Sequence, residues 1–580
     1  MKKSVLALLL AACMLLAMMA GCGSAAEPAA SGAGAEGSAA EAEAPAAEPE
    51  TEAEAEPAAE AETPADSAVE PEEPAEPAEE IVLPPYEPGD DTPVTMLFQF
   101  MPFVQSWFPE GWGSSPWWDE FESRTNTTWE LREISGMAWQ ENVNLLCASN
   151  DLPDVVSNIG NVYSGGLSQA IRDEMILDLS PLVEENAPYY YNAISQDEYT
   201  MRTIINDDGE MGGMYAVNSK VYPVTNGLWI RKDWLDGIGM DVPRTTEDMK
   251  KVLAGFRDTY GADIGLYQMV HMNENKVFTA VEGVWNAFGS TDFYLEGDEV
   301  RFGPVQDYYF EYLAFLKDLA QDGLFLTSSM TDQTSMTLFA SGGIGIQGDD
   351  PDNLTANIAL LPEEEQAKVE MVPMAALGEP TELGPRASIA NGEGSISIST
   401  NCEAPEAVLH AIDYLFTEEG AILSSYGIEG LTFEYEDGQP QLTDLILKDP
   451  DGMPARAAMG YFCNPGLPGI IDPDRSHKYW SDAQKSGYGI WESAYTGSSM
   501  TFPKDALSLT TEEQDSIAVY YNDMVTYATE WANGVVFGDT ELTDAEIETY
   551  RKTMTDSMHI EEIIGVYQAA YDRFLARDVG

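Results

Sequence analysis

The feature that most limits the fold is a long segment, residues 23–90, that has almost nothing with which to build a core. It holds 20 acidic residues, 11 prolines, no Lys or Arg, and a single aromatic residue, Tyr86. Burial of so little apolar surface cannot offset the entropy lost on folding. Like charges and prolines also extend a chain. We therefore expect a disordered linker here and a folded part that starts at about residue 91; an acidic interaction tail is the alternative.

The first residues predict export. Lys2 and Lys3 precede an apolar run over 5–20, and Met19-Ala20-Gly21 leads into Cys22. A cationic start, a short apolar stretch and small residues are typical of a signal peptide, here residues 1–21. The cysteine at the cut site resembles a bacterial lipobox, although Met19 stands where Leu is usual. We expect lipidation of Cys22 and attachment to the outer face of a membrane; an ordinary signal peptide with an incidental Cys22 is the alternative.

The composition of residues 91–580 excludes several classes of function. These residues hold 80 acidic against 26 basic side chains, a net charge of −54. So negative a surface argues against binding nucleic acid and against adsorption on anionic lipid. They also hold 58 of the 59 aromatic residues, and their length exceeds that of one ordinary domain. Two lobes are therefore expected.

The periodicity of the chain predicts strands interleaved with helices. Apolar or alternating runs at 94–100, 154–156, 343–346 and 395–399 indicate strands. Helical spacing starts after Thr245, over 309–319 and from Pro405. The C-terminal section is helical, with capping boxes predicted at Thr511/Gln514 and Thr543/Glu546. The pattern predicts an α/β protein with terminal helices.

No catalytic or metal motif stands out. The histidines are isolated, so neither a zinc site nor another cofactor is expected. The acidic turns 349–352 and 449–452 lack the ligand spacing of a calcium loop. Cys147, Cys402 and Cys463 form no disulfide framework, although one pair stays open. A carboxylate pair for glycoside hydrolysis also stays open, because sequence spacing does not give spatial separation.

An aromatic loop follows the first predicted strand. Gln105 and Trp107 open it, and Trp112, Trp117 and Trp118 follow. Ligands of open α/β sheets gather at the carboxyl ends of strands, and indole rings suit the apolar faces of sugars. The loop is thus a candidate sugar-binding segment; the alternative is that these tryptophans pack in the core.

Six blocks in order along the chain resemble the extracellular solute-binding lipoproteins of bacterial ABC importers, family 1, and in particular large carbohydrate-type lipoproteins of Gram-positive bacteria. They are 148–156 (ASNDLPDVV), 176–182 (ILDLSPL), 214–217 (MYAV), 230–245 (IRKDWL, then Gly239, Pro243 and Thr245), 339–345 (FASGGIG) and 405–430 (PEA, DYL, EG, YGIEG).

The resemblance implies a periplasmic-binding-protein type II-like fold, with two α/β lobes, a crossover hinge and a helical C-terminal section. The first lobe would hold about 94–217 and 348–385, and the second about 222–346 and much of 386–580. Approximate ligand positions carried over from the family are Gln105, Trp107, Asn161, Asn218, Tyr222, His271, Trp285, Asp349 and Trp480.

The sequence-based hypothesis is a monomeric, non-enzymatic lipoprotein that captures a solute between two lobes and delivers it to an ABC permease. An oligosaccharide is the expected solute, with no cofactor, metal or nucleic acid involved. A surface-anchored glycoside hydrolase and a sugar-binding adhesion or sensory module are the rival hypotheses.

Overall fold

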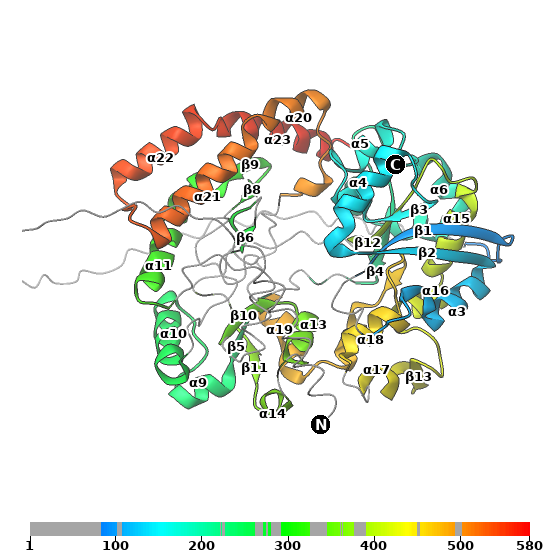
Figure 1. Ribbon diagram of the computed structural model, residues 1–580, viewed down its shortest axis with the longest axis horizontal. Helices are drawn as coiled ribbons and strands as arrows, with labels where there is room; N and C mark the ends of the chain where they lie inside the picture. The colour runs from blue at the N-terminus through cyan, green and yellow to red at the C-terminus, as the bar shows by residue number, and fades with distance from the viewer. Residues whose placement is uncertain are drawn as a thin grey trace, which may run out of the picture. The chain divides into compact units, whose positions relative to one another are not determined.

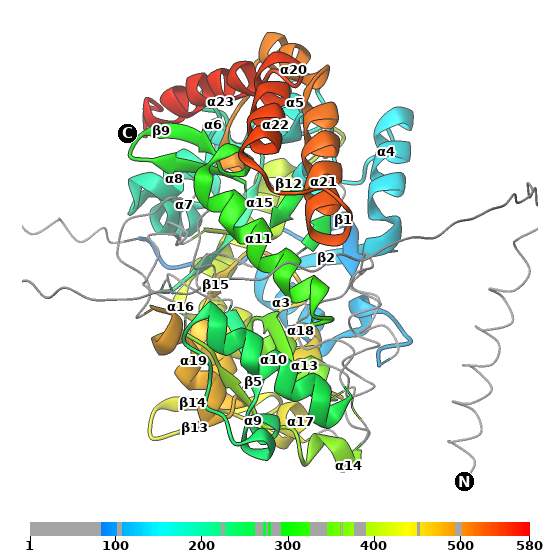
Figure 2. The same ribbon diagram turned by 90° about the vertical axis from the view of Figure 1, so that its left-hand side faces the viewer.

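The computed structural model describes residues 83–100, 107–220, 222, 227–261, 271–273, 276–279, 292–324, 345–359, 361, 363–375, 377, 390–448, 453–492 and 502–579. The predicted signal peptide, Cys22 and most of the predicted linker lie outside these residues. Two lobes, each built on its own sheet, make up the described part of the chain (Figures 1 and 2).

The first lobe is built on a six-stranded sheet of order β15-β4-β12-β3-β1-β2. β1 runs parallel to β2 and β3, β12 is antiparallel to β3 and β4, and β15 is parallel to β4. The bounds are β1 Thr92–Phe100, β2 Thr127–Ser135, β3 Val155–Ser157, β4 Met214–Asn218, β12 Ala390–Ile398 and β15 Ile470–Ile471. The strands predicted at 94–100, 154–156 and 395–399 are thereby confirmed, with shifts of a residue or a few at their ends.

The apolar side chains of β1 contribute to two hydrophobic clusters, because successive residues of a strand point to opposite faces of the sheet. Val94, Met96 and Phe98 belong to the main core of this lobe, whereas Leu97 points to a smaller cluster under α4. Helices cover both faces because a mostly parallel sheet must be buried on both sides. They are α3 Pro116–Thr125, α4 Trp139–Ser149, α5 Gly166–Arg172, α6 Ser180–Asn186, α7 Pro188–Ser195, α8 Glu198–Ile204, α15 Pro405–Asp413, α16 Glu418–Tyr426, α17 Asp444–Leu447 and α18 Ala455–Phe462, with the hairpin β13 Phe433–Glu436 and β14 Gln439–Leu442.

The second lobe is built on a three-stranded antiparallel sheet, β10-β5-β11. The strands are β5 Gly227–Arg231, β10 Ile346–Asp349 and β11 Met371–Pro373. α9 Lys232–Ile238, α10 Thr246–Tyr260, α11 Asp307–Gln321, α13 Pro351–Ala359, α14 Glu363–Gln366 and α19 Asp482–Glu492 belong to this lobe, as do the hairpins β6 His271–Asn273 with β7 Lys276–Thr279 and β8 Phe293–Glu296 with β9 Glu299–Phe302. Thr245 caps α10 through the backbone N–H of Asp248, as predicted.

The C-terminal helices pack in the core of the second lobe. They are α20 Thr511–Ala518, α21 Tyr521–Phe537, α22 Asp544–Asp556 and α23 Ile560–Leu575, and α21 lies beside α11 (Figures 1 and 2). The capping box predicted at Thr511/Gln514 is wrong by one residue. Thr510 caps α20, and Glu513 returns the second hydrogen bond. Thr543 caps α22 through the backbone N–H of Glu546, which is one of the two hydrogen bonds of the predicted capping box.

The predicted division of the chain between the lobes is wrong at residues 348–385. Within 348–385, which was expected in the first lobe, β10 and β11 flank β5 in the second sheet. Much of 386–580 was expected in the second lobe, and α20–α23 pack in its core. The earlier part of this stretch packs in the first lobe: β12 fills the gap between β3 and β4, and α15–α18 join the main core. The chain therefore returns to the first sheet at β12, later than expected, because the strands that contain Ile346 and Met371 pair with β5.

The end of the predicted linker also differs from expectation. Tyr86 stacks on His410 with ring centroids 4.8 Å apart and donates to the His410 carbonyl. The hydroxyl of Tyr189 donates to Pro84 O (2.7 Å), and Asn126 Nδ2 donates to Gly89 O (2.9 Å). Residues 84–89 are thus fixed to the first lobe, because Tyr86, the one aromatic residue of the acidic segment, packs against the core of that lobe.

Candidate functional site

The strand registers bring several chain segments to one edge of the first sheet, here called the carboxyl edge. β1, β3, β4 and β15 all run toward it, and the start of β12 lies there because Ala390 pairs with Val217. Asn161 follows β3, and Asn218 is the last residue of β4. These two predicted site residues therefore share an edge, where ligands of such sheets gather.

A network of side-chain amides and hydroxyls lies at this edge. Asn158 Nδ2 donates to Gln99 Oε1 (3.1 Å), and Ser395 Oγ donates to Asn158 Oδ1 (3.2 Å). Asn158 adopts a left-handed backbone conformation (φ 49°), which asparagine tolerates better than most residues. Sequence reasoning missed Gln99 and Asn158; the available signal was a polar residue at the end of each buried strand.

A charged cluster lies where the chain leaves the first sheet. The carboxylate of Asp474, just beyond β15, accepts hydrogen bonds from Lys220 Nζ and the Tyr222 hydroxyl. Burial opposes ionisation of Asp474, but these two donors outweigh it and hold its pKa below the usual range. Burial likewise lowers the pKa of His477, whose Nδ1 lies 3.5 Å from Asp474 Oδ1. Tyr222, a predicted ligand residue, is thus part of a polar cluster at the crossover.

Trp480 does not have the exposed ring expected of a sugar platform. It is only 5% exposed, and its Nε1 donates to Asp352 Oδ1 at 2.5 Å. Tyr479 and Ser476 donate to the same carboxylate, at 2.7 and 2.8 Å. Because Asp352 lies in the first turn of α13, these bonds join the segment after β15 to the second lobe. The indole contributes to the connection between the lobes and has no free face for a ligand.

The aromatic loop after β1 also differs from expectation. Trp112, Trp117 and Trp118 are buried in the first core, and Trp117 Nε1 donates to Leu423 O (3.2 Å). Their interpretation as a sugar-binding cluster is therefore wrong, since most of the ring area is used in packing. Trp107 remains 37% exposed and keeps an accessible ring.

The structure describes the remaining predicted positions only in part. Asp349 ends β10 and pairs with Gly227 at the start of β5, and His271 begins β6. The side chains of these two residues are not described. Gln105 and Trp285 lie outside the described residues.

A pocket of about 770 Å³ opens between elements of the two lobes. Its first-lobe wall carries Asn161, Tyr215, Asn206, Glu210 and Ser395, together with residues of α5. Its second-lobe wall carries Lys504, Gln514, Tyr567 and residues 506–509. Burial raises the pKa of Tyr215 to about 12, so its phenol stays protonated and able to donate. Hydroxyls, amides and two tyrosines around a space of this size suit a small polar ligand.

An arginine clasp holds the second-lobe wall against the first lobe. We use this name for Asp207, Glu513, Arg573 and Arg577. Asp207 accepts from Arg573 Nε (2.7 Å) and from Arg577 Nε and Nη2 (2.9 and 2.7 Å). Arg577 also donates to the carbonyl of Ala506 (2.9 Å) and to Ser508 Oγ (3.0 Å). Since Ala506 and Ser508 line the pocket, the clasp fixes the pocket wall.

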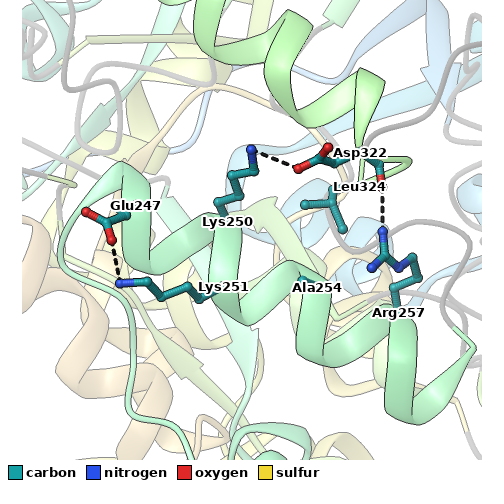
Figure 3. Close-up of a pocket in the computed structure, with 7 residues that line it drawn as sticks. All are labelled: Glu247, Lys250, Lys251, Ala254, Arg257, Asp322 and Leu324. Carbon is teal, nitrogen blue, oxygen red and sulfur yellow. Dashed lines mark hydrogen bonds and ion pairs between the residues drawn. The ribbon is translucent and has the colours of Figure 1, made fainter. Parts of the chain in front are cut away.

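A second hollow, of about 480 Å³, lies on α10 and the end of α11 (Figure 3). Its basic side chains are already paired: Lys250 with Asp322 (2.8 Å), Lys251 with Glu247 (2.7 Å), and Arg257 with the carbonyl of Asp322. Such compensated charges on an exposed helix are the ordinary solvated surface of a helix.

Two kinds of feature are absent from the described residues. No group of three or more His, Cys, Asp or Glu side chains is placed to hold a metal ion. No described helix is long and apolar enough to cross a membrane.

Several known proteins resemble this chain in sequence. The chain is 25% identical over 197 residues to the fructooligosaccharide ABC transporter substrate-binding protein FusA of Streptococcus pneumoniae, covering 32% of this chain and 36% of FusA. It is 22% identical over 335 residues to the polygalacturonan/rhamnogalacturonan-binding protein YtcQ of Bacillus subtilis, covering 54% and 62%. The matches therefore span less than two thirds of each of these relatives.

Solved structures share the fold over most of the described chain. The alginate-binding protein AlgQ2 without calcium ion superposes with a TM-score of 0.63 at 20% identity, covering 83% of this chain and 98% of AlgQ2. An HMO-binding, ABC-transporter-associated solute-binding protein from Bifidobacterium longum infantis gives 0.64 at 17%, covering 83% and 99%. The two-lobed α/β fold is thereby confirmed. The sequence profile of bacterial extracellular solute-binding proteins matches residues 106–422, more than half of the chain, so this protein belongs to that family.

Proposed function

We propose that this protein is the substrate-binding lipoprotein of an ABC importer and that it captures an oligosaccharide between its lobes. The observation that carries the proposal is the interlobe pocket. Its walls come from two separately packed lobes, and hydroxyl, amide and tyrosine side chains line it. Hinge closure on a ligand is the usual way in which two such lobes bind. The names of FusA, YtcQ and the HMO-binding structure support a sugar as the solute.

The protein would bind the oligosaccharide without changing it covalently. Amides such as Asn161 and hydroxyls such as Ser395 would exchange hydrogen bonds with sugar hydroxyls, and Tyr215 and Tyr567 would cover apolar ring faces. The clasp and the hydrogen bonds to Asp352 of α13 join the lobes on separate sets of contacts. The captured solute would then pass to the permease subunits.

Calorimetric titration of the folded part with a panel of oligosaccharides and short peptides tests the capture step. Asn161→Ala should weaken binding of the preferred oligosaccharide, whereas Lys251→Ala, on the exposed hollow of α10, should not. Binding of peptides alone, or equal effects of both substitutions, would contradict the proposal.

Two further experiments test anchoring and delivery. Cys22→Ser should abolish incorporation of labelled palmitate and release the protein from membranes. Deletion of the gene should abolish uptake of the captured sugar; normal uptake would favour an adhesion or sensory role instead. Product formation on long incubation would favour the hydrolase.

A further inference from the structure

The interlobe pocket contains one cation whose surroundings differ from those of the basic residues described above. Lys504 lines the pocket and donates from Nζ to the Tyr521 hydroxyl at 2.5 Å. The same ammonium group lies 4.8 Å from the ring centroid of Tyr521, 5.7 Å from that of Tyr567 and 5.8 Å from that of Phe293. Aromatic faces attract a cation but do not neutralise its charge.

No ion pair recorded among the described residues involves Lys504. This contrasts with Arg573 and Arg577 of the neighbouring clasp, which are paired with Asp207 and Glu513. It also contrasts with Lys250 and Lys251 on the α10 hollow. The contrast is informative because residues 91–580 carry 80 acids for 26 bases, so a carboxylate partner is easy to find.

Within the described part of the chain, Tyr521 is the one hydrogen-bond acceptor of the Lys504 ammonium group. An ammonium group has three N–H donors, and the hydrogen bond to Tyr521 uses one. Glu210, the one acidic residue that lines the described pocket, accepts a hydrogen bond from Asn206 Nδ2 (2.7 Å). A charged donor with spare N–H groups at a pocket wall suits an anionic oxygen group on the ligand.

We propose that Lys504 is a specificity-determining residue that binds an anionic group of the captured sugar, so that the pocket selects acidic over neutral oligosaccharides. This inference rests on the proposed sugar-binding function. Carboxylate and sulfate groups share the required chemistry, because the ammonium of lysine acts as a compact point charge without the planar fork of arginine.

The test compares ligands that differ only in charge. Short oligouronates and their fully methyl-esterified, neutral forms are titrated into the folded protein, with a sulfated oligosaccharide as a further arm. The unaltered protein should bind the uronate at least about tenfold more tightly than the ester, as expected for a hydrogen bond between charged groups. Preference for the sulfated arm over the uronate would identify sulfate as the group bound.

Lys504→Met should remove this preference, so that the uronate and the ester bind with similar affinity, and a cooperative melting transition shows that the variant is folded. Lys504→Arg should retain the preference, and Lys251→Met is the matched control on the exposed hollow. Tight binding of neutral sugars without any preference for acidic ones would overturn the inference and leave the proposed function intact. An acidic preference that survives in Lys504→Met would exclude Lys504 as its cause. Failure to bind any sugar would overturn both proposals.

Discussion

Replacing Asp207 with alanine should lower the free energy of unfolding by about 3–5 kcal/mol, the cost of removing one partner from a buried ion pair. Asp207 accepts three hydrogen bonds from two guanidinium groups. The side chain of Arg577 is only 1% exposed, so water cannot replace the lost carboxylate. Arg573 keeps Glu513 as a partner, and most of the cost therefore falls on Arg577.

Urea denaturation followed by tryptophan fluorescence measures this loss. Glu247→Ala is the matched control, because it also removes a carboxylate from an ion pair, with Lys251, but its side chain is 79% exposed. Such a surface pair contributes about 0–1 kcal/mol. Equal, small effects of the two substitutions would refute the reasoning, since burial would then have no influence on the value of the ion pair.

Four other substitutions test separate parts of the structure. Gly420→Ala should destabilise the first lobe by several kcal/mol, because an added Cβ would lie 1.9 Å from the backbone oxygen of Tyr414. Gly565→Ala should instead stabilise α23 by about 0.5–1 kcal/mol, because an added Cβ there meets nothing within 4 Å. Thermal melting of both variants checks this. Burial, opposed by a hydrogen bond from the Tyr190 backbone N–H, raises the pKa of Asp413 from 3.8 to about 7. Between pH 3.8 and 7 the folded protein holds a proton on Asp413 that the unfolded chain releases, so the stability that this group contributes is full below pH 3.8 and is lost as pH rises toward 7. The free energy of unfolding should therefore fall with pH in this range, by up to about 1.4 kcal/mol per pH unit. Asp413→Asn should remove this pH dependence, which denaturation at several pH values measures. Tyr86→Ala should release residues 84–89, seen as faster proteolysis near residue 90 with little change in the main unfolding transition.

The local parts of the fold could be predicted well from sequence. β1, β3 and α10 form where alternation or helical spacing indicates, because neighbouring residues decide these elements. The division between lobes could not be predicted, since β12 inserts between two strands far earlier in the chain. Only the three-dimensional pairing shows that β10 and β11 belong with β5.

The candidate site could be predicted in part for the same reason. Asn161 was carried over from the family resemblance as a residue that follows a strand, and it lines the interlobe pocket. Trp112 packs in the core, which was the alternative left open for it, and the ring of Trp480 is buried as well. Sequence does not distinguish a buried indole from an exposed one. Lys504 carries no motif, and its importance depends on the aromatic rings and the pocket that surround it.

The segment 504–509 takes part both in the contacts that hold the lobes together and in the wall of the proposed sugar-binding pocket. This segment carries Lys504 into the pocket, and its Ala506 and Ser508 are held by Arg577, which also donates to the carbonyl of Arg202 in α8 (2.5 Å). The charged groups of the clasp therefore do not need to touch the ligand in order to influence it. They fix the wall on which the ligand-facing side chain stands, and a binding residue is only as well placed as the contacts that support it. The buried clasp is thus better explained as a support for a precisely positioned wall than as a source of stability alone, because buried ion pairs are weak stabilisers in comparison with apolar packing.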